Sequence, residues 1–341
     1  MGPLLRTVDK SHPSLQTNFP FFTEKRSKGF CRSWHLPKRR STMKIIHNLD
    51  EWQQISGESA PPGPVTGVLV GPPDHFDIVD VRNEHMKDQV GNVRHDLAWD
   101  QWKRFCQSII QLGLKVHQIE VEPDQVDAVF TANPSLSTSD RRGNPRIILG
   151  RMNHPNRIPE TEFHLKAYTE LGLQCDELPS TITTWEGNGD TLRDLTRPLL
   201  WCGLGPRSEF AGHIAAAEIL DLDLALLELP DPRYYHLDTA LAILNESTIA
   251  IVADAFNSEG LELLNGAFEN LIEVDPQEAQ HRLAGNMWSP DGSHVLISSQ
   301  TPVTSANLKA HGFRVIETET DEFLKSGGSV FCMRQEIRDA R

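Results

Sequence analysis

The sequence predicts an α/β fold. Short runs rich in β-branched and aromatic residues alternate, from residue 43 onward, with longer segments in which apolar residues recur every three or four positions. The composition, 38% hydrophobic and 23% charged, is typical of a folded globular domain. The longest uncharged apolar stretches, Thr248–Ala253 and Val295–Ser299, are far shorter than the roughly 20 residues of a membrane-spanning helix. We therefore expect a soluble protein without a membrane partner.

Each element is predicted from its local pattern. The predicted strands are short apolar runs bounded by turn-forming residues: Val65–Val70, Ala128–Thr131, Arg146–Leu149, Ser247–Val252, His294–Ser298, Arg314–Glu317 and Ser329–Met333. The predicted helices carry apolar residues on one face: Asp96–Leu112, Glu160–Leu171, Ser208–Leu220, Leu261–Asn270 and Ser305–Ala310. The proline-rich segments Pro61–Pro64 and Pro72–Pro73 indicate loops within one domain and not a linker between two.

The charge divides the chain into two parts. Residues 1–42 carry nine basic and two acidic residues, a net charge of +7, whereas residues 43–341 have a net charge of −21. The basic leader lacks the apolar core of a secretory signal, but its composition is typical of an organelle transit peptide. Alternatively, Met43 is the true start and residues 1–42 are a non-native extension. We therefore expect a folded domain over 43–341, located in the cytoplasm, or in an organelle if the leader is a genuine transit peptide.

The acidic body and the scattered cysteines narrow the classes of function. A general nucleic-acid role needs a basic face, which is not expected here, whereas a cationic small substrate would be attracted. Cys31, Cys106, Cys175, Cys202 and Cys332 form no Cys-x-x-Cys pair and have no zinc-ligand spacing with histidines. We therefore predict no disulfide scaffold, no metal site and no cofactor, and expect any functional cysteine to act alone.

Polar residues gather in five segments that follow or precede predicted elements, where active sites of α/β proteins tend to lie. The segments are VFTANP with Asn133, RMNHPNRIPE with Arg151 and Arg157, WEGNGD with Glu186, Asn188 and Asp190, YYHLDTAL with His236 and Asp238, and SGGSVFCM with Cys332.

Taken singly, each of these residues also has a structural interpretation. Cys332 lies between two apolar residues and is typical of a buried core cysteine, and Asp238 is typical of a helix cap before TALAIL. The EGNGD segment is typical of a surface turn, and Arg157 and Arg207 of solvated surface arginines. Together, however, a thiol, an imidazole, carboxylates and arginines are the groups needed to attack the carbon of a cationic amidine.

These segments resemble, in chain order, those of the guanidino-group-modifying superfamily. That superfamily includes arginine deiminase, dimethylarginine dimethylaminohydrolase, arginine dihydrolase and the amidinotransferases. The similar segments extend from RNEHM and AWDQW (Asn83 to Trp102) through VFTAN, RMNHPNR, EGNGD, GLGPR and HLDT to GGSVFCM. The resemblance implies a pentein-type, five-bladed, pseudo-symmetric α/β-propeller over 43–341.

The resemblance also implies the catalytic roles. Cys332 would be the nucleophile that attacks the guanidinium carbon and forms a covalent thiouronium. His236 would protonate the leaving amine and later activate water, with Glu186 as its acidic partner.

The substrate-binding residues follow in the same way. Asp190 and Asp238 resemble groups that bind guanidinium nitrogens, and Arg157 and Arg207 resemble the arginines that hold the substrate α-carboxylate. Asn83 is similar to a substrate-contacting residue of arginine dihydrolases. Asn133 stands where deiminases and the dimethylarginine enzymes have an aspartate, as it does in arginine dihydrolases, so the exact substrate stays open.

The sequence therefore predicts a cysteine-dependent hydrolase that acts on the guanidino group of arginine or an Nω-methylated arginine and yields citrulline, or ornithine if hydrolysis continues. The alternatives are an arginine dihydrolase or deiminase, an amidinotransferase in which an acceptor amine replaces water, and a non-catalytic binding propeller. The expected partner is a small guanidino substrate, and whether the chain forms a homo-oligomer stays open.

Overall fold

Strand–helix–strand units build the molecule. The computed structural model describes residues 43–55 and 59–340, whose strands form five sheets. Each sheet contains a parallel pair of consecutive strands, and a helix lies between the two because parallel neighbours need a crossover connection. The units are β2 (Val65–Val70), α2 (His95–Gln111) and β3 (Lys115–Gln118); β5 (Pro145–Leu149), α3 (Glu160–Glu170) and β6 (Cys175–Glu177); β8 (Leu199–Leu204), α5 (Phe210–Leu220) and β9 (Asp223–Glu228); β11 (Thr248–Ile251), α6 (Ser258–Ala267) and β12 (Asn270–Glu273); and β13 (His294–Ser298), α8 (Pro302–Ala310) and β14 (Arg314–Thr318). The predicted α/β class is confirmed.

Antiparallel strands extend four of these pairs. They are β4 (Ser135–Ser139) beside β5, β7 (Thr191–Arg193) beside β8, β10 (Leu241–Ile243) beside β11, and β15 (Gln335–Arg338) beside β2. In the β13 sheet a single bridge between Trp288 and Leu296 takes the same place, and β1 (Ile45–Ile46) adds a parallel edge to β9. The β15–β2 pairing brings the end of the chain beside the first long strand, with Gln335 opposite Leu69. The segment just before β15, which contains Cys332, is thereby anchored in the interior.

Short helical turns carry the connections. They are α1 (Leu49–Trp52), α4 (Gly187–Asp190), α7 (Pro276–Arg282) and α9 (Asp321–Leu324), with the 3₁₀ turns η1 (Glu84–Met86), η2 (Pro155–Arg157), η3 (Leu237–Thr239) and η4 (Ala253–Ala255). Many of the predicted site residues lie at these turns: Asn83 precedes η1, Glu186 precedes α4 and His236 precedes η3. Side chains at such positions project from the ends of elements and are free to meet side chains from other units.

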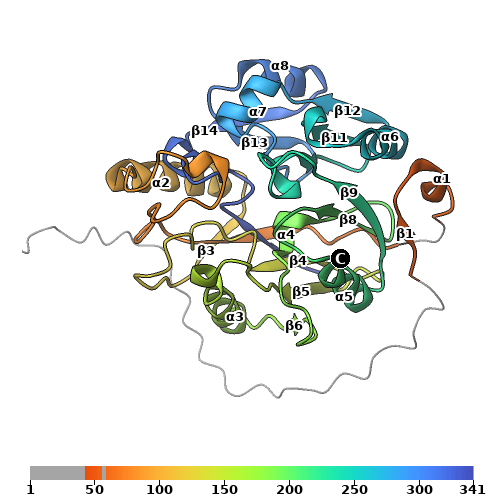
Figure 1. Ribbon diagram of the computed structural model, residues 1–341, viewed down its shortest axis with the longest axis horizontal. Helices are drawn as coiled ribbons and strands as arrows, with labels where there is room; N and C mark the ends of the chain where they lie inside the picture. The colour runs from red at the N-terminus through yellow and green to blue at the C-terminus, as the bar shows by residue number, and fades with distance from the viewer. Residues whose placement is uncertain (1–42, 56–58, 341) are drawn as a thin grey trace, which may run out of the picture. The chain divides into compact units, whose positions relative to one another are not determined.

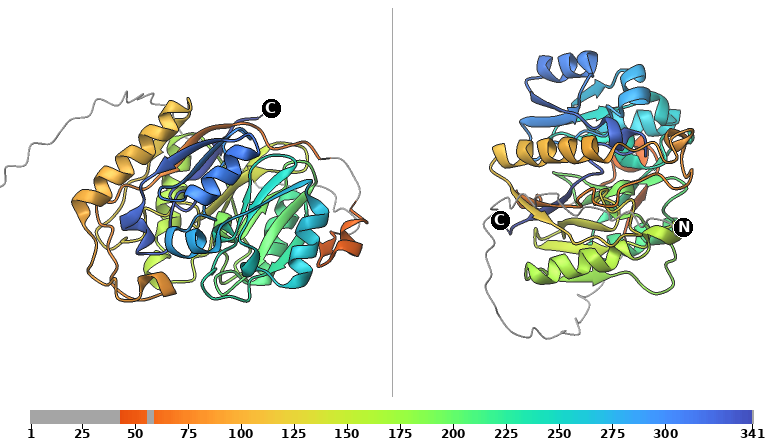
Figure 2. Two further views of the ribbon diagram at one scale, coloured as in Figure 1. Left: turned by 90° about the horizontal axis from the view of Figure 1, so that it is seen from above. Right: turned by 90° about the vertical axis from the view of Figure 1, so that its left-hand side faces the viewer.

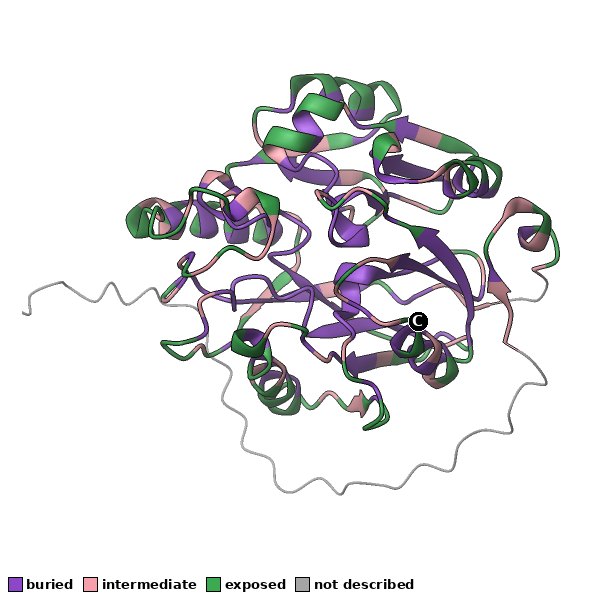
Figure 3. Ribbon diagram, in the orientation of Figure 1, coloured by how far each residue is buried: buried purple, intermediate pink, exposed green. Residues whose placement is uncertain are grey.

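The crossover helices lie at the periphery and the strands inside (Figure 1), and two further views place the long helix α2 on the outside (Figure 2). Most strand residues are buried, while the exposed residues concentrate on the outer faces of the helices (Figure 3). Helix α2 illustrates the cause, since Trp102, Phe105 and Ile109 recur at helical spacing and are buried. None of the helices in the described part of the chain is long and apolar enough to span a membrane.

All five predicted helices and five of the seven predicted strands are confirmed within a few residues. Two predicted strands are wrong. Residues 128–131 and 329–333 form successive turns, with backbone bonds from Phe130 N to Asp127 O and from Met333 N to Ser329 O. The strands of these regions start later, at Ser135 and Gln335. Apolar and β-branched residues mark burial, and here they are buried in turns around the site and not in a ladder.

The segment after Asp238 is the strand β10 and not a helix, so the helix-cap interpretation of Asp238 is wrong. The leader, residues 1–42, lies outside the described residues. The described residues belong to one compact unit.

Candidate active site

Six of the predicted site residues line one small interior pocket. They are Asn83, Asn133, Arg157, Arg207, His236 and Cys332, contributed by segments spread over the whole described chain. The other three predicted residues, Glu186, Asp190 and Asp238, are fully buried and lie in contact with pocket residues or with the turns that carry them.

Cys332 is held by hydrogen bonds from two directions. Its thiol lies 3.2 Å from Asp238 Oδ2, to which it donates, and 3.2 Å from the Nδ2 donor of Asn286. The backbone N–H of Cys332 donates to Asn286 Oδ1 at 3.2 Å. Burial, together with the neighbouring Asp238 carboxylate, raises the pKa of the Cys332 thiol well above its ordinary value. The resting site therefore holds a neutral thiol, and the thiolate needs an additional positive charge nearby.

The two glycines before Cys332 are each required for a different structural reason. Gly327 has φ +86°, a left-handed conformation that other residues rarely adopt. A Cβ at Gly328 would lie 2.1 Å from the ring of Phe130, so only glycine fits between this turn and the pocket wall. Tyr235 also donates its hydroxyl to the Gly327 carbonyl at 2.6 Å. These contacts fix the turn that carries the thiol.

His236 is oriented by a buried carboxylate. Its Nε2 lies 2.7 Å from Glu186 Oε2, and Oε1 of Glu186 accepts from the Asn153 N–H at 3.0 Å. Burial alone would raise the pKa of Glu186, but the bond from His236 and nearby positive charges lower it to about 2. Burial alone would likewise lower the pKa of His236, but the carboxylates of Asp190, Glu186 and Asp238 raise it above its ordinary value. The pair therefore favours a protonated imidazole, which is suited to donate a proton.

The two predicted guanidinium-binding aspartates differ in what they contact. Asp190 accepts from Ser208 Oγ at 2.6 Å and from the Leu237 N–H at 3.3 Å, so both of its oxygens are hydrogen-bonded within the protein. Asp238 has one oxygen on the thiol, and no donor among the described residues reaches its Oδ1. Burial raises the pKa of Asp238 to about 6. Of these two aspartates, Asp238 is therefore the one with an oxygen that no donor among the described residues engages.

The two predicted carboxylate-binding arginines also differ. Arg157 makes a bidentate ion pair with Glu160, with Nε 2.9 Å from Oε1 and Nη2 2.8 Å from Oε2, and Nη1 donates to Asn133 Oδ1 at 3.1 Å. Arg207 lies over the Tyr235 ring at 4.9 Å, and its Nη1 is 3.5 Å from Glu186. Arg207 thus has donors to spare, whereas Arg157 is largely engaged within the protein.

The contact with Arg157 sets the orientation of Asn133. Because Oδ1 of Asn133 accepts from Arg157, its Nδ2 faces Nδ1 of His236 at 3.5 Å. Asn133 therefore presents a donor where a carboxylate would present an acceptor. Asn83 bonds to the protein with both polar atoms, capping η1 through Oδ1 and donating from Nδ2 to the Ser326 carbonyl at 3.0 Å.

Several pocket residues were not identified from the sequence. Arg82 and Asp127 form an ion pair at the pocket wall, and Tyr235 contributes its ring. Asn286, which donates to the Cys332 sulfur and accepts from the Cys332 N–H, was also not identified. The available signals were weak: Arg82 directly precedes Asn83, and Gly285 directly precedes Asn286. A Cβ at Gly285 would lie 2.3 Å from the Thr239 carbonyl, so this glycine marks a close approach next to the site.

The contact between Asn286 and Cys332 makes a direct prediction. Replacing Asn286 by leucine removes the donor to sulfur at similar size, and a hydrogen bond to a charged group contributes about 1.5–3 kcal/mol. The Asn286 donor is one of the groups that lower the pKa of the Cys332 thiol, so this pKa should rise further in the variant. The pH dependence of alkylation of Cys332 by iodoacetamide, located by peptide mass spectrometry, measures this shift. Asn265→Leu on the exposed face of α6 is the control, and equal alkylation profiles for the two variants would contradict the assigned contact.

Within residues 43–55 and 59–340, no group of three or more histidine, cysteine, aspartate or glutamate side chains is placed to hold a metal ion.

Comparison with known proteins places this site in context. Residues 72–339 match the family described as "N,N dimethylarginine dimethylhydrolase, eukaryotic". The chain is 33% identical over 266 residues to an N(G),N(G)-dimethylarginine dimethylaminohydrolase of Mycobacterium tuberculosis, covering 78% of this chain and 84% of that protein. It is 32% identical over 273 residues to the bifunctional arginine dihydrolase/ornithine cyclodeaminase AgrE of Nostoc, covering 80% of this chain but only 38% of that longer protein.

Solved structures agree with these matches. The N-terminal domain of the cyanobacterial arginine dihydrolase ArgZ, a cysteine-to-serine variant bound to substrate, superposes with a TM-score of 0.73 at 29% identity, covering 80% of this chain and 98% of that domain. A second ArgZ structure holds a covalently bound reaction intermediate. The dimethylarginine dimethylaminohydrolase of Pseudomonas aeruginosa shares the fold with a TM-score of 0.66. On the match over residues 72–339, this chain belongs to the eukaryotic N,N dimethylarginine dimethylhydrolase family.

Proposed function

We propose that this protein is a cysteine-dependent hydrolase of the guanidino group of arginine or an Nω-methylated arginine. The observation that carries the proposal is the arrangement at one pocket. Its lining includes both a thiol bonded to Asp238, whose second oxygen has no donor among the described residues, and a histidine paired with Glu186. Carboxylates hold a guanidinium, a thiolate attacks its carbon, and an imidazolium protonates the departing amine.

The substrate's own charge supports the first step. A guanidinium bound by Asp238 places a positive charge beside Cys332, which lowers the raised pKa of the thiol. The thiol loses its proton to solvent, and the thiolate adds to the guanidinium carbon. His236 gives its proton to the leaving nitrogen, and the C–N bond breaks to release the amine and leave a covalent thiouronium. His236, now neutral, takes a proton from water, and the resulting hydroxide adds to the same carbon. Expulsion of the thiolate, with loss of the hydroxyl proton to solvent, releases a ureido product, and reprotonation of the thiolate restores the enzyme.

A second candidate, arginine dihydrolase, is favoured by Asn133. An amide held by Arg157 replaces the negative charge that an aspartate would give at this position, so a neutral ureido group is less disfavoured there than beside another carboxylate. Citrulline formed in the first round would then stay bound and be hydrolysed again to ornithine, ammonia and carbon dioxide. The relatives carry both activities in their names, a dimethylaminohydrolase and an arginine dihydrolase.

Identification of the reaction products distinguishes these candidate functions. The full chain is incubated separately with arginine and with asymmetric dimethylarginine, and the products are identified by mass spectrometry. Citrulline and dimethylamine from the second substrate alone would establish a dimethylarginine hydrolase, whereas ornithine from arginine would establish a dihydrolase. No product from either substrate until an acceptor amine is added would instead support an amidinotransferase, and no product under any condition would favour a non-catalytic propeller.

We assign the α-carboxylate of the substrate to Arg207, together with the second Nη1 hydrogen of Arg157. Arg207→Ala should raise the KM for arginine about tenfold or more, with a smaller effect for agmatine, which has no α-carboxylate. Steady-state kinetics on both substrates measure the ratio. Arg157→Ala is expected to lower kcat as well, because it also releases Asn133. Equal effects of Arg207→Ala on the two substrates would remove this arginine from carboxylate binding.

We infer further that the five sheets are the blades of a five-bladed, pseudo-symmetric pentein-type propeller, since each repeats the same strand–helix–strand order.

We also propose a cytoplasmic location, or an organellar one if residues 1–42 are a transit peptide. The expected partner is a small guanidino substrate, without nucleic acid, and a homo-oligomer is compatible with this proposal.

A further inference from the structure

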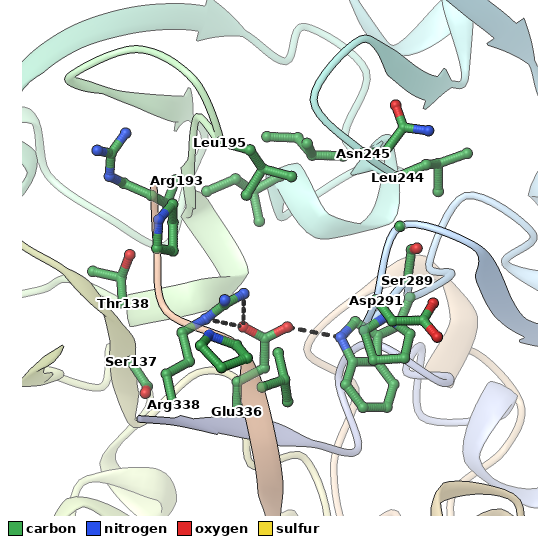
Figure 4. Close-up of a pocket in the computed structure, with 18 of the residues that line it drawn as sticks. Ser137, Thr138, Arg193, Leu195, Leu244, Asn245, Ser289, Asp291, Glu336 and Arg338 are labelled. Atoms are coloured by element: carbon green, nitrogen blue, oxygen red, sulfur yellow. Dashed lines mark hydrogen bonds and ion pairs between the residues drawn. The ribbon is translucent and has the colours of Figure 1, made fainter. Parts of the chain in front are cut away.

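A second, larger cavity lies on the other side of the segment that carries the thiol. Cys332 lines the active-site pocket, whereas the preceding residue, Phe331, lines the second cavity. In the same way, Asn286 contacts the thiol while Met287 faces the second cavity. The cavity has a volume of about 700 Å³, within the range of small-molecule sites. Figure 4 shows side chains from several elements converging on it.

Arg334 is the unusual residue in its wall. The side chain is 1% exposed, and its guanidinium carbon lies 3.5 Å from the centre of the Phe331 ring and 5.2 Å from that of Trp288. No acceptor among the described residues reaches its Nε or Nη1. A buried charge without a hydrogen-bonded partner is costly, so such groups usually have a bound counter-charge.

The neighbouring arginine provides a contrast. Arg338 donates from Nε to Glu336 at 2.9 Å and from Nη1 to the Gly63 carbonyl at 2.6 Å. Glu336 also accepts from the Trp288 indole at 2.7 Å, as Figure 4 shows for the labelled carboxylate. The Arg338–Glu336 pair is hydrogen-bonded, whereas Arg334 lies near the carboxylates of Glu336 and Asp238 without a hydrogen bond to either from its Nε or Nη1.

The charges of the cavity are separated between its interior and its rim. Arg193 is buried like Arg334, and its Nε also has no acceptor among the described residues. Burial lowers the pKa of both arginines to about 10, which leaves them cationic at neutral pH. At the rim, Glu246 and Asp291 are exposed. A ligand therefore meets positive charge inside and negative charge at the entrance.

We propose that this cavity binds a small zwitterionic metabolite of the α-amino acid class, with its carboxylate toward Arg334 and its ammonium toward the acidic rim. Two guanidinium nitrogens of Arg334 have no acceptor among the described residues and suit one carboxylate, and the carboxylates at the rim disfavour a polyanion while attracting an ammonium. Ser137 and Thr138 of β4 supply hydroxyls, and Leu195 and Leu244 supply apolar surface for a short side chain. The site is distinct from the active-site pocket, since the two share no lining residue.

Isothermal titration calorimetry of the full chain with three matched probes tests this site. The probes are L-norvaline, which has both charges and no guanidino group, pentanoate, which lacks the ammonium, and n-butylamine, which lacks the carboxylate. We expect binding of norvaline, weaker binding of pentanoate and none of butylamine. Arg334→Met should weaken norvaline binding about tenfold or more, whereas Arg314→Met, an exposed arginine outside the cavity, should not.

Two further variants keep the test decisive. Leu195→Trp at the cavity wall leaves Arg334 in place and should block norvaline by filling the space, which covers the case in which Arg334→Met does not fold. Arg207→Met removes an arginine of the active-site pocket and should leave norvaline binding unchanged. The proposal is overturned if the wild-type chain binds no norvaline. It is overturned equally if binding is lost in Arg207→Met and retained in Arg334→Met or Leu195→Trp, because the ligand then occupies the active site.

Discussion

Cys332→Ser is expected to reduce turnover of guanidino substrates by about 10³-fold or more while leaving the fold intact. The reason is chemical. A serine hydroxyl ionises far less readily than a thiol and is a poor nucleophile without a strong base beside it. The groups around Cys332 are an amide donor, Asn286, and a carboxylate, Asp238, and neither is a base of that strength. The oxygen of serine fits the same hydrogen bonds, so substrate binding should persist.

Single-turnover kinetics measure the expected loss of turnover, and binding of unreacted substrate measures whether substrate binding persists. Cys106→Ser is the matched control. Cys106 is a buried cysteine of α2 that is far in sequence from the pocket residues near the end of the chain, and its variant should keep the wild-type activity per folded molecule. A Cys332→Ser variant that still accumulates a covalent adduct, or turns over at a rate close to that of the wild type, would show that another residue is the nucleophile.

Glu186→Gln should lower kcat by about 10²-fold or more and change its pH dependence. Protonation of the leaving amine requires a cationic His236, so this step fails as the pH rises through the pKa of His236. The carboxylate of Glu186, 2.7 Å away, is one of the charges that raise this pKa. Its removal lowers the pKa of His236, and the loss of activity should therefore begin at a lower pH than in the wild type.

The pH profile of kcat tests this directly, because a purely structural effect would lower the rate without moving the profile. Glu209→Gln is the control: it removes a carboxylate only a few positions from the GLGPR segment, but one that bonds the Thr183 and Thr184 backbone and does not line the pocket. A profile for Glu186→Gln that coincides in shape with that of the wild type would mean that His236 is not the titrating acid.

Part of the site could be predicted because its residues lie in short, distinctive segments. Cys332 after two glycines, His236 two residues before Asp238, and Glu186 in a glycine-rich turn are recognisable without knowledge of the fold. The elements that were predicted correctly, such as α2 and β13, have local periodicity that depends only on the geometry of a helix or a strand. The two wrong strands show the limit of that reasoning, because burial in a turn produces the same apolar pattern.

The contacts that define the chemistry were decided by tertiary structure. Asn286 is 46 positions from Cys332, Asp238 is 94 positions away, and Asn133 is 103 positions from His236. Which oxygen of Asp238 has no donor, which way the Asn133 amide points and which arginine is engaged by Glu160 all depend on how separate sheets pack.

The sequence by itself determined the α/β class and most of the elements, since these follow from local periodicity, and it nominated nine candidate residues through short motifs and the family resemblance that they carry. Only the tertiary structure decided how those residues pair, which of them face the pocket, and that Arg334 lines a second cavity behind the thiol. The physical reason is that periodicity is a property of neighbouring residues, whereas hydrogen bonds, burial and shifted pKa values arise between residues that only folding brings together.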